Sequence, residues 1–74
     1  MNRIKVTVEK AGHNYSAFIP SIDGIIGVGK APADAIKSLC ESIEILREEH
    51  DLTGDDFPEE LLGDYELVVD EVKN

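Results

Sequence analysis

The spacing of apolar residues changes from two to three or four at Pro32, and it returns to two at Tyr65. Alternation of apolar and polar residues predicts half-buried strands, whereas spacings of three and four predict an amphipathic helix. The four expected strands cover residues 3–9, 15–19, 25–29 and 65–72. The chain therefore predicts the element order β-β-β-α-β.

The single expected helix begins at Pro32, because proline suits the first helical position, and ends near His50. Its apolar face consists of Ala35, Ile36, Leu39, Cys40, Ile43 and Leu46. An acidic connection over 51–64 follows, in which residues 58–62 are expected to form one helical turn. Before the helix, the glycines at 27 and 29 indicate either a bulge or a close backbone approach.

This order predicts one α+β domain over residues 1–74, with two layers. The first three strands form an antiparallel meander, and a right-handed crossover places the last strand parallel to the first. The expected sheet is mixed and four-stranded, with order 3-2-1-4 and the helix on one face. The other face holds four candidates for self-association, which are Phe18, Ile26, Val68 and Val72. An uncovered apolar face favours a homo-dimer or a higher homo-oligomer.

The acidic residues are concentrated in the second half of the chain. The net charge is −9, and thirteen of the sixteen acidic residues lie within residues 41–74, which carry only two basic residues. Such a surface repels phosphate, so direct binding of nucleic acid is not expected. It suits a basic protein partner, although acidic surface also serves solubility alone.

The sequence offers little for catalysis, cofactors or metals. A lone cysteine, Cys40, excludes an intrachain disulfide, and neither His13 nor His50 has a nucleophile nearby in sequence. The acidic residues after Asp51 lack the glycine and glutamate of a calcium-binding loop. No apolar run reaches the ~18–20 residues of a membrane span, and the start lacks a signal-peptide core, so a cytoplasmic location is expected. We therefore expect neither an enzyme nor a cofactor, and no contact with membranes.

Several of these features resemble the HicB antitoxin family. The resemblance rests on Asn14–Pro20, Gly24, Gly29 and the pair Asp34–Ala35 at the start of the helix, and it covers about residues 3–49. It implies a partial ribonuclease-H-like fold and a prokaryotic toxin–antitoxin system. In such a system the antitoxin binds a small basic ribonuclease, HicA, and blocks its RNA-binding surface.

The chain departs from the family pattern at three points. Ala31 stands where a threonine usually caps the helix, and Ile25 stands where cysteine is frequent. No DNA-binding segment follows the last expected strand, so we expect no DNA-binding domain and no operator binding. Nuclease activity is not expected either, because the centre of the first strand, Lys5–Thr7, carries no carboxylate for a metal.

Two functions follow as hypotheses. The first is an antitoxin-type module that covers the RNA-binding face of a basic ribonuclease. Its candidate contact residues are Glu41, Glu44, Ile45, Glu48, Asp51, Asp55, Asp56, Glu59 and Glu60. Ile45 is either an isolated exposed aliphatic residue or an anchor within this acidic surface. The second is a homo-oligomeric structural or regulatory protein of HicB type without a toxin partner.

Overall fold

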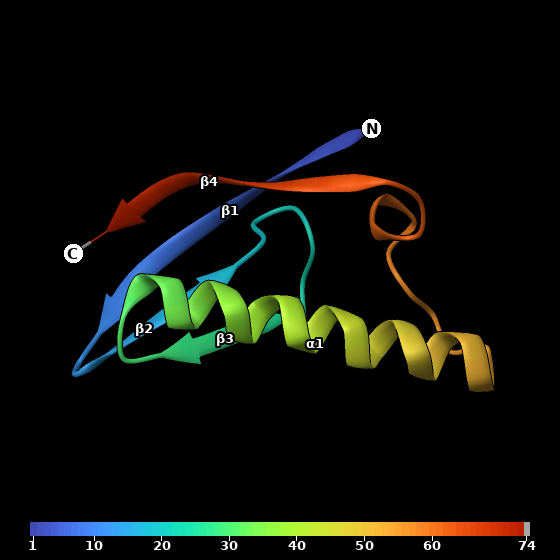
Figure 1. The fold of residues 1–74 in the computed structure, drawn as a ribbon, viewed down its shortest axis with the longest axis horizontal. Coiled ribbons are helices and arrows are strands. Elements are labelled where there is room, and N and C mark those ends of the chain that lie inside the picture. Colours follow the sequence, from blue (N-terminus) through green and yellow to red (C-terminus); the bar gives the residue numbers. More distant parts are fainter. Residues whose placement is uncertain (74) are drawn as a thin grey trace.

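A mixed sheet and one long helix make up the fold in the computed structural model, which describes residues 1–73. The elements run in the predicted order, with a short 3-10 helix, η1, before the last strand (Figure 1). Their bounds are β1 (Asn2–Ala11), β2 (Asn14–Phe18), β3 (Ile26–Gly29), α1 (Pro32–Thr53), η1 (Glu59–Leu61) and β4 (Tyr65–Lys73). None of the helices formed within residues 1–73 combines the length and the apolar character of a membrane span.

The strand order β3-β2-β1-β4 confirms the predicted topology. β1 and β2 pair antiparallel through a turn in which Gly12 adopts a φ of 63°, a value that favours glycine. β2 and β3 also pair antiparallel, and β4 runs parallel to β1 after the crossover through α1. The expected α+β architecture, with one helix and a four-stranded mixed sheet, is therefore correct.

The pairing of β1 with β4 contains an irregularity that the sequence pattern did not reveal. The register shifts by one residue between Val6 and Thr7. Val6 is paired with Val69, whereas Val8 is paired with Val72. A bulge of this kind reverses the alternation of the bulged strand beyond it. Val72 therefore lies beside Val8, on the helix side of the sheet, which corrects its expected place on the opposite face with Phe18.

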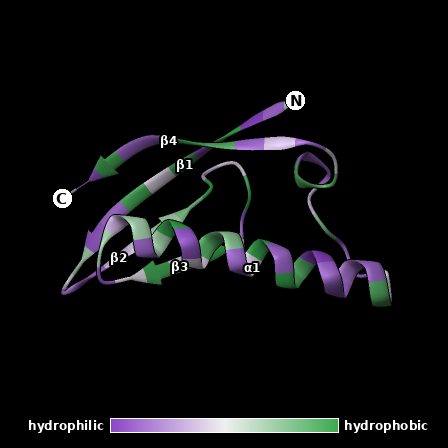
Figure 2. Ribbon diagram, in the orientation of Figure 1, coloured by the Kyte–Doolittle hydropathy of each residue, from purple (hydrophilic) through white to green (hydrophobic). Residues whose placement is uncertain are grey.

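The core lies between α1 and the sheet. Its main buried residues are Ile4, Val6, Val8, Ala17, Ile19, Ala35, Leu39, Ile43 and Leu61. The helix packs mainly on β3 and β2, and leaves β4 at the far edge of the sheet (Figure 1). Hydrophilic stretches dominate the second half of α1, which extends beyond the strands (Figure 2). The predicted apolar face is therefore buried near its centre, whereas Leu46 is exposed.

The helix ends later than the sequence pattern indicated. It continues to Thr53 and stops where Gly54 adopts a left-handed φ of 77° and donates its backbone N–H to the carbonyl of His50 at 2.9 Å. At the other end, Ala31 makes no side-chain capping hydrogen bond, as its aliphatic side chain predicts. The expected turn over 58–62 is the 3-10 helix η1.

Candidate protein-binding surface

The nine candidate contact residues are all exposed and lie toward one end of the molecule. Five of them lie on α1, with Glu41 just before its midpoint and the other four on its second half, two follow the helix, and two lie on η1. These segments occupy the same end of an elongated molecule with extents of 36 × 23 × 17 Å (Figure 1). The nine predicted residues therefore share one end of the molecule, and we call this end, defined by these nine residues, the acidic end.

No ion pair within residues 1–73 neutralises the acidic end. The ion pairs that these residues form join Arg3 to Glu66 at 3.8 Å and Lys73 to Glu9 and Glu71 at 3.5 and 3.9 Å. All of them lie on β1 and β4, away from the second half of α1. The negative charge of the acidic end is therefore available to attract a cationic molecule.

The segment after the helix is held in place by several contacts. The Nδ1 atom of His50 lies within hydrogen-bonding distance of the Asp55 carbonyl, and its ring packs on Phe57 with centroids 5.8 Å apart. The backbone N–H of Asp55 donates to Thr53 Oγ1 at 3.3 Å, and this hydroxyl donates in turn to the Glu49 carbonyl at 2.7 Å. Further along, Leu61 is completely buried in the core. The carboxylates at 55–60 are thus carried on a well-anchored connection.

Ile45 does not stand alone on the surface. It is 57% exposed and lines a shallow hollow of about 260 Å³ with Ile26, which is 54% exposed, and with Leu46. Gly24, Ile25 and Ser42 complete the lining. We call this feature the α1–β3 hollow. From the sequence, Ile45 was expected on the partner-binding surface and Ile26 on the self-association surface. The two residues lie on different elements, and only the packing of α1 on β3 brings them together.

Two serine side chains attach the edge strand β3 to the helix. The backbone N–H of Val28 donates to Ser38 Oγ at 3.2 Å, and Ser42 Oγ donates to the carbonyl of Ile26 at 3.4 Å. These bonds occupy backbone groups on the side of β3 that has no strand neighbour. They close this edge to further strand pairing and hold Ile26 in a defined position next to the helix.

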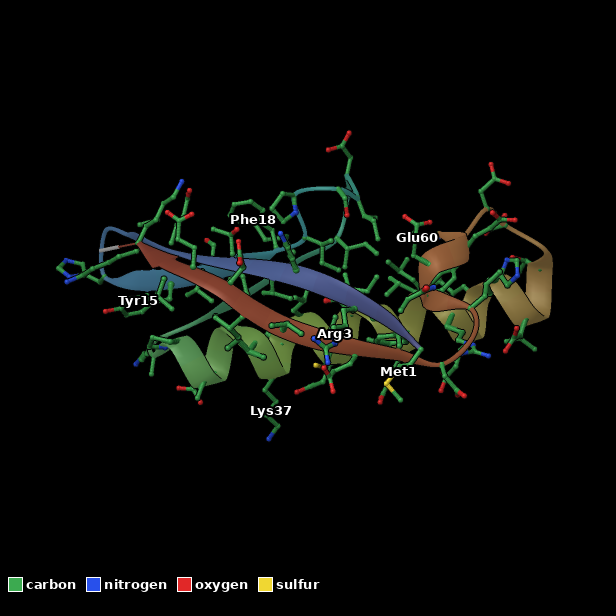
Figure 3. All side chains as sticks on the ribbon, turned by 90° about the horizontal axis from the view of Figure 1, so that it is seen from above. Met1, Arg3, Tyr15, Phe18, Lys37 and Glu60 are labelled. Carbon is green, nitrogen blue, oxygen red and sulfur yellow. The ribbon has the colours of Figure 1, made fainter. Side chains whose placement is uncertain are left out.

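The sheet face opposite the helix carries a second apolar surface. Phe18 lies on that face, whereas Lys37 points away from the sheet on the outer side of α1 (Figure 3). By register, Phe18 pairs with Ile26, and Val28 lies on the same face two residues further along β3. Val28 is 51% exposed and Val68 37% exposed. Val28 was absent from the sequence-based candidates, although its alternation with Gly27 and Gly29 is the signal that places it there.

The flank of α1 toward β4 carries groups with altered acidity. Burial, with Glu44 and Glu41 as smaller contributors, raises the pKa of the Cys40 thiol. Burial also raises the pKa of Tyr65, with a smaller contribution from Cys40. Both groups are therefore uncharged at neutral pH. Among the described residues, no group of three or more histidine, cysteine or carboxylate side chains is placed to hold a metal ion.

Comparisons with models of protein families, with curated proteins and with solved structures found no match to this chain. The features that bear on function are therefore the fold, the acidic end and the resemblance of the sequence to HicB antitoxins.

Proposed function

We propose that this chain is an antitoxin-type binding module of HicB type, which neutralises a small basic ribonuclease by covering its RNA-binding face. The observation that carries the proposal is the acidic end, where carboxylates on α1, the following segment and η1 share one end of the molecule and have no ion-pair partners among residues 1–73. A surface that binds RNA phosphates is positively charged. An array of carboxylates is complementary to such a surface and competes with RNA for it.

The architecture supports the same proposal. The strand order β3-β2-β1-β4 with a single helix is the arrangement that the resemblance to HicB antitoxins implies. The position of the acidic residues adds support, because they lie on a long helix and an anchored connection. Carboxylates on such elements lose little conformational freedom on binding, and this favours affinity.

If the proposal is correct, the reading frame adjacent to that of this protein encodes a short, lysine-rich protein, and the test uses the two proteins together. The two are co-expressed and purified, and their dissociation constant is measured by calorimetry at several salt concentrations. We expect tight binding that weakens as salt increases, and loss of the partner's ribonuclease activity in the complex. Absence of binding at low salt, or an unchanged ribonuclease activity, contradicts the proposal.

A charge variant tests whether binding depends on the carboxylates of the acidic end or on the net negative charge of the whole protein. The triple variant Glu41→Gln, Glu44→Gln, Glu48→Gln removes three carboxylates from α1, and we expect it to weaken binding about tenfold. The matched control, Glu66→Gln with Asp70→Gln and Glu71→Gln, removes the same charge from β4. It should leave the affinity within about twofold, since these carboxylates lie outside the proposed contact.

A second function is favoured by the apolar sheet face. Phe18, Ile26, Val28 and Val68 expose aliphatic and aromatic surface on the side without a helix. Pairing of two such faces would bury this surface in a homo-oligomer without a toxin. Sedimentation at micromolar concentration distinguishes the two, because a homo-oligomer of a protein with charge −9 is strengthened by salt, whereas an acidic–basic complex is weakened.

A further inference from the structure

We propose that the α1–β3 hollow binds one apolar side chain from a lysine- or arginine-rich segment of the partner, with Ile45 and Ile26 as its walls. This inference rests on the proposed function, because it specifies how the acidic surface would hold a basic protein. Ile26, expected from sequence to serve self-association, lies by register on the sheet face opposite the helix with Phe18, and at the edge of that face it also lines the hollow.

The size and lining of the hollow suit a side chain. Its volume of about 260 Å³ lies below the roughly 300–1,000 Å³ typical of small-molecule pockets. Ile25, Ile26, Ile45 and Leu46 provide aliphatic walls, and Gly24 and Ser42 complete it. Burial of one aliphatic or aromatic group there would remove apolar surface of both proteins from water.

The charge around the hollow specifies the chemistry of the occupant. Glu41, Glu48 and Glu49 lie four residues before, three after and four after Ile45 on the helix, so they are its neighbours on the surface. Within residues 1–73 none of the three forms an ion pair. An apolar centre surrounded by carboxylates matches an apolar residue flanked by lysine or arginine. A second copy of this chain would bring the same carboxylates against each other.

The walls of the hollow are fixed before any partner arrives. Ser42 donates to the carbonyl of Ile26, and Ser38 accepts from the N–H of Val28, so the edge strand is attached to the helix on both sides of Gly27. Ile25 is buried in the core beside them. A preformed apolar site costs little ordering on binding, and central apolar anchors surrounded by polar residues dominate the energies of many interfaces.

The experiment compares two exposed aliphatic residues on the same helix. Ile45→Ala removes a wall of the hollow, whereas Leu52→Ala truncates a residue that is 85% exposed and lies outside the lining. Each purified variant is titrated by calorimetry into the basic protein from the adjacent reading frame. We expect Ile45→Ala to weaken binding at least tenfold and Leu52→Ala less than twofold. Because neither change removes a charge, the salt dependence should stay that of the unmodified protein.

Ile26→Ala provides an independent measurement from the other wall, and we expect a loss of about fivefold or more. Urea unfolding of every variant verifies that weak binding does not reflect an unfolded protein. If Ile45→Ala and Ile26→Ala both bind within twofold of the unmodified protein, the inference is wrong. It is also wrong if these changes convert a homo-dimer into a monomer while the affinity for the basic protein is unchanged.

The outcomes separate this inference from the function on which it rests. Salt-sensitive binding that weakens in the triple glutamate variant but not in Ile45→Ala supports the proposed function and overturns the apolar anchor. Failure of the unmodified protein to bind the basic protein overturns both. Loss of affinity in both sets of variants supports both.

Discussion

The backbone of Leu39 on α1 lies directly against Gly27 on β3, at a separation that leaves no room for a side chain on the strand. A Cβ atom at position 27 would lie 2.7 Å from the Leu39 Cα atom, and it would also collide with the backbone at Ala35. Gly29 is similar, since a Cβ there would lie 2.5 Å from the Asp34 Cβ atom. Of the two interpretations that the sequence allowed for these glycines, the close backbone approach is correct.

Gly27→Ala is therefore expected to be strongly destabilising. The added methyl group meets helix backbone, which cannot rotate away, so the helix must move off β3. We expect a loss of about 3 kcal/mol or more in the free energy of unfolding, measured by urea titration. Gly63→Ala is the matched control, because nothing lies within 4 Å of a Cβ at that position. Equal stability of the two variants would show that α1 does not rest on Gly27.

The hydrogen bonds of Ser38 and Ser42 with the edge strand β3 predict a small contribution of each serine to stability. Ser38→Ala and Ser42→Ala each remove one hydrogen bond between α1 and β3. We expect each to lower the free energy of unfolding by about 0.5–1 kcal/mol, since the bonds lie near the surface. Hydrogen exchange at the Val28 amide should accelerate in Ser38→Ala, and Ser21→Ala, in an exposed turn, serves as the control. An unchanged exchange rate at Val28 would contradict the assigned bond.

The acidity of Cys40 and Tyr65 predicts how stability depends on alkaline pH. Burial chiefly raises the pKa of both groups above their ordinary values of 9.0 and 10.0. The unfolded chain therefore releases these protons first, and stability falls as the pH rises above about 9. Urea unfolding at pH about 8, 9.5 and 10.5 measures this decline. Cys40→Ala should make it shallower, and a stability that is constant across this range would contradict the prediction.

The anchoring of η1 predicts a large effect on stability from a residue that lies outside the long helix and the strands. Leu61 is completely buried, and truncation to alanine leaves a cavity in the core. We expect Leu61→Ala to cost about 2–5 kcal/mol in the free energy of unfolding. The control Leu52→Ala, at an exposed position, should cost less than about 0.5 kcal/mol. A small effect at both positions would mean that η1 contributes little to the fold.

The candidate surface was predictable only in part. The carboxylates from Glu41 to Glu60 are close in sequence, and their grouping follows from one helix and the segment attached to its end. The meeting of Ile45 with Ile26 was not predictable, because it depends on where α1 lies across the sheet. Val72 was placed on the wrong face for a related reason, since one bulge between β1 and β4 reverses the alternation beyond it.

Local patterns in the chain were enough to determine the strands, the helix, their order and the segregation of charge. Alternation around Val6, spacing of three and four around Leu39, and the right-handed crossover rule all act over short distances or restrict topology strongly. Packing decided the rest: the bulge, the burial of Leu61, and the approach of α1 to Gly27 that forms the α1–β3 hollow. These features depend on how complete surfaces fit together in three dimensions, and a pattern of neighbouring residues carries no information about that fit.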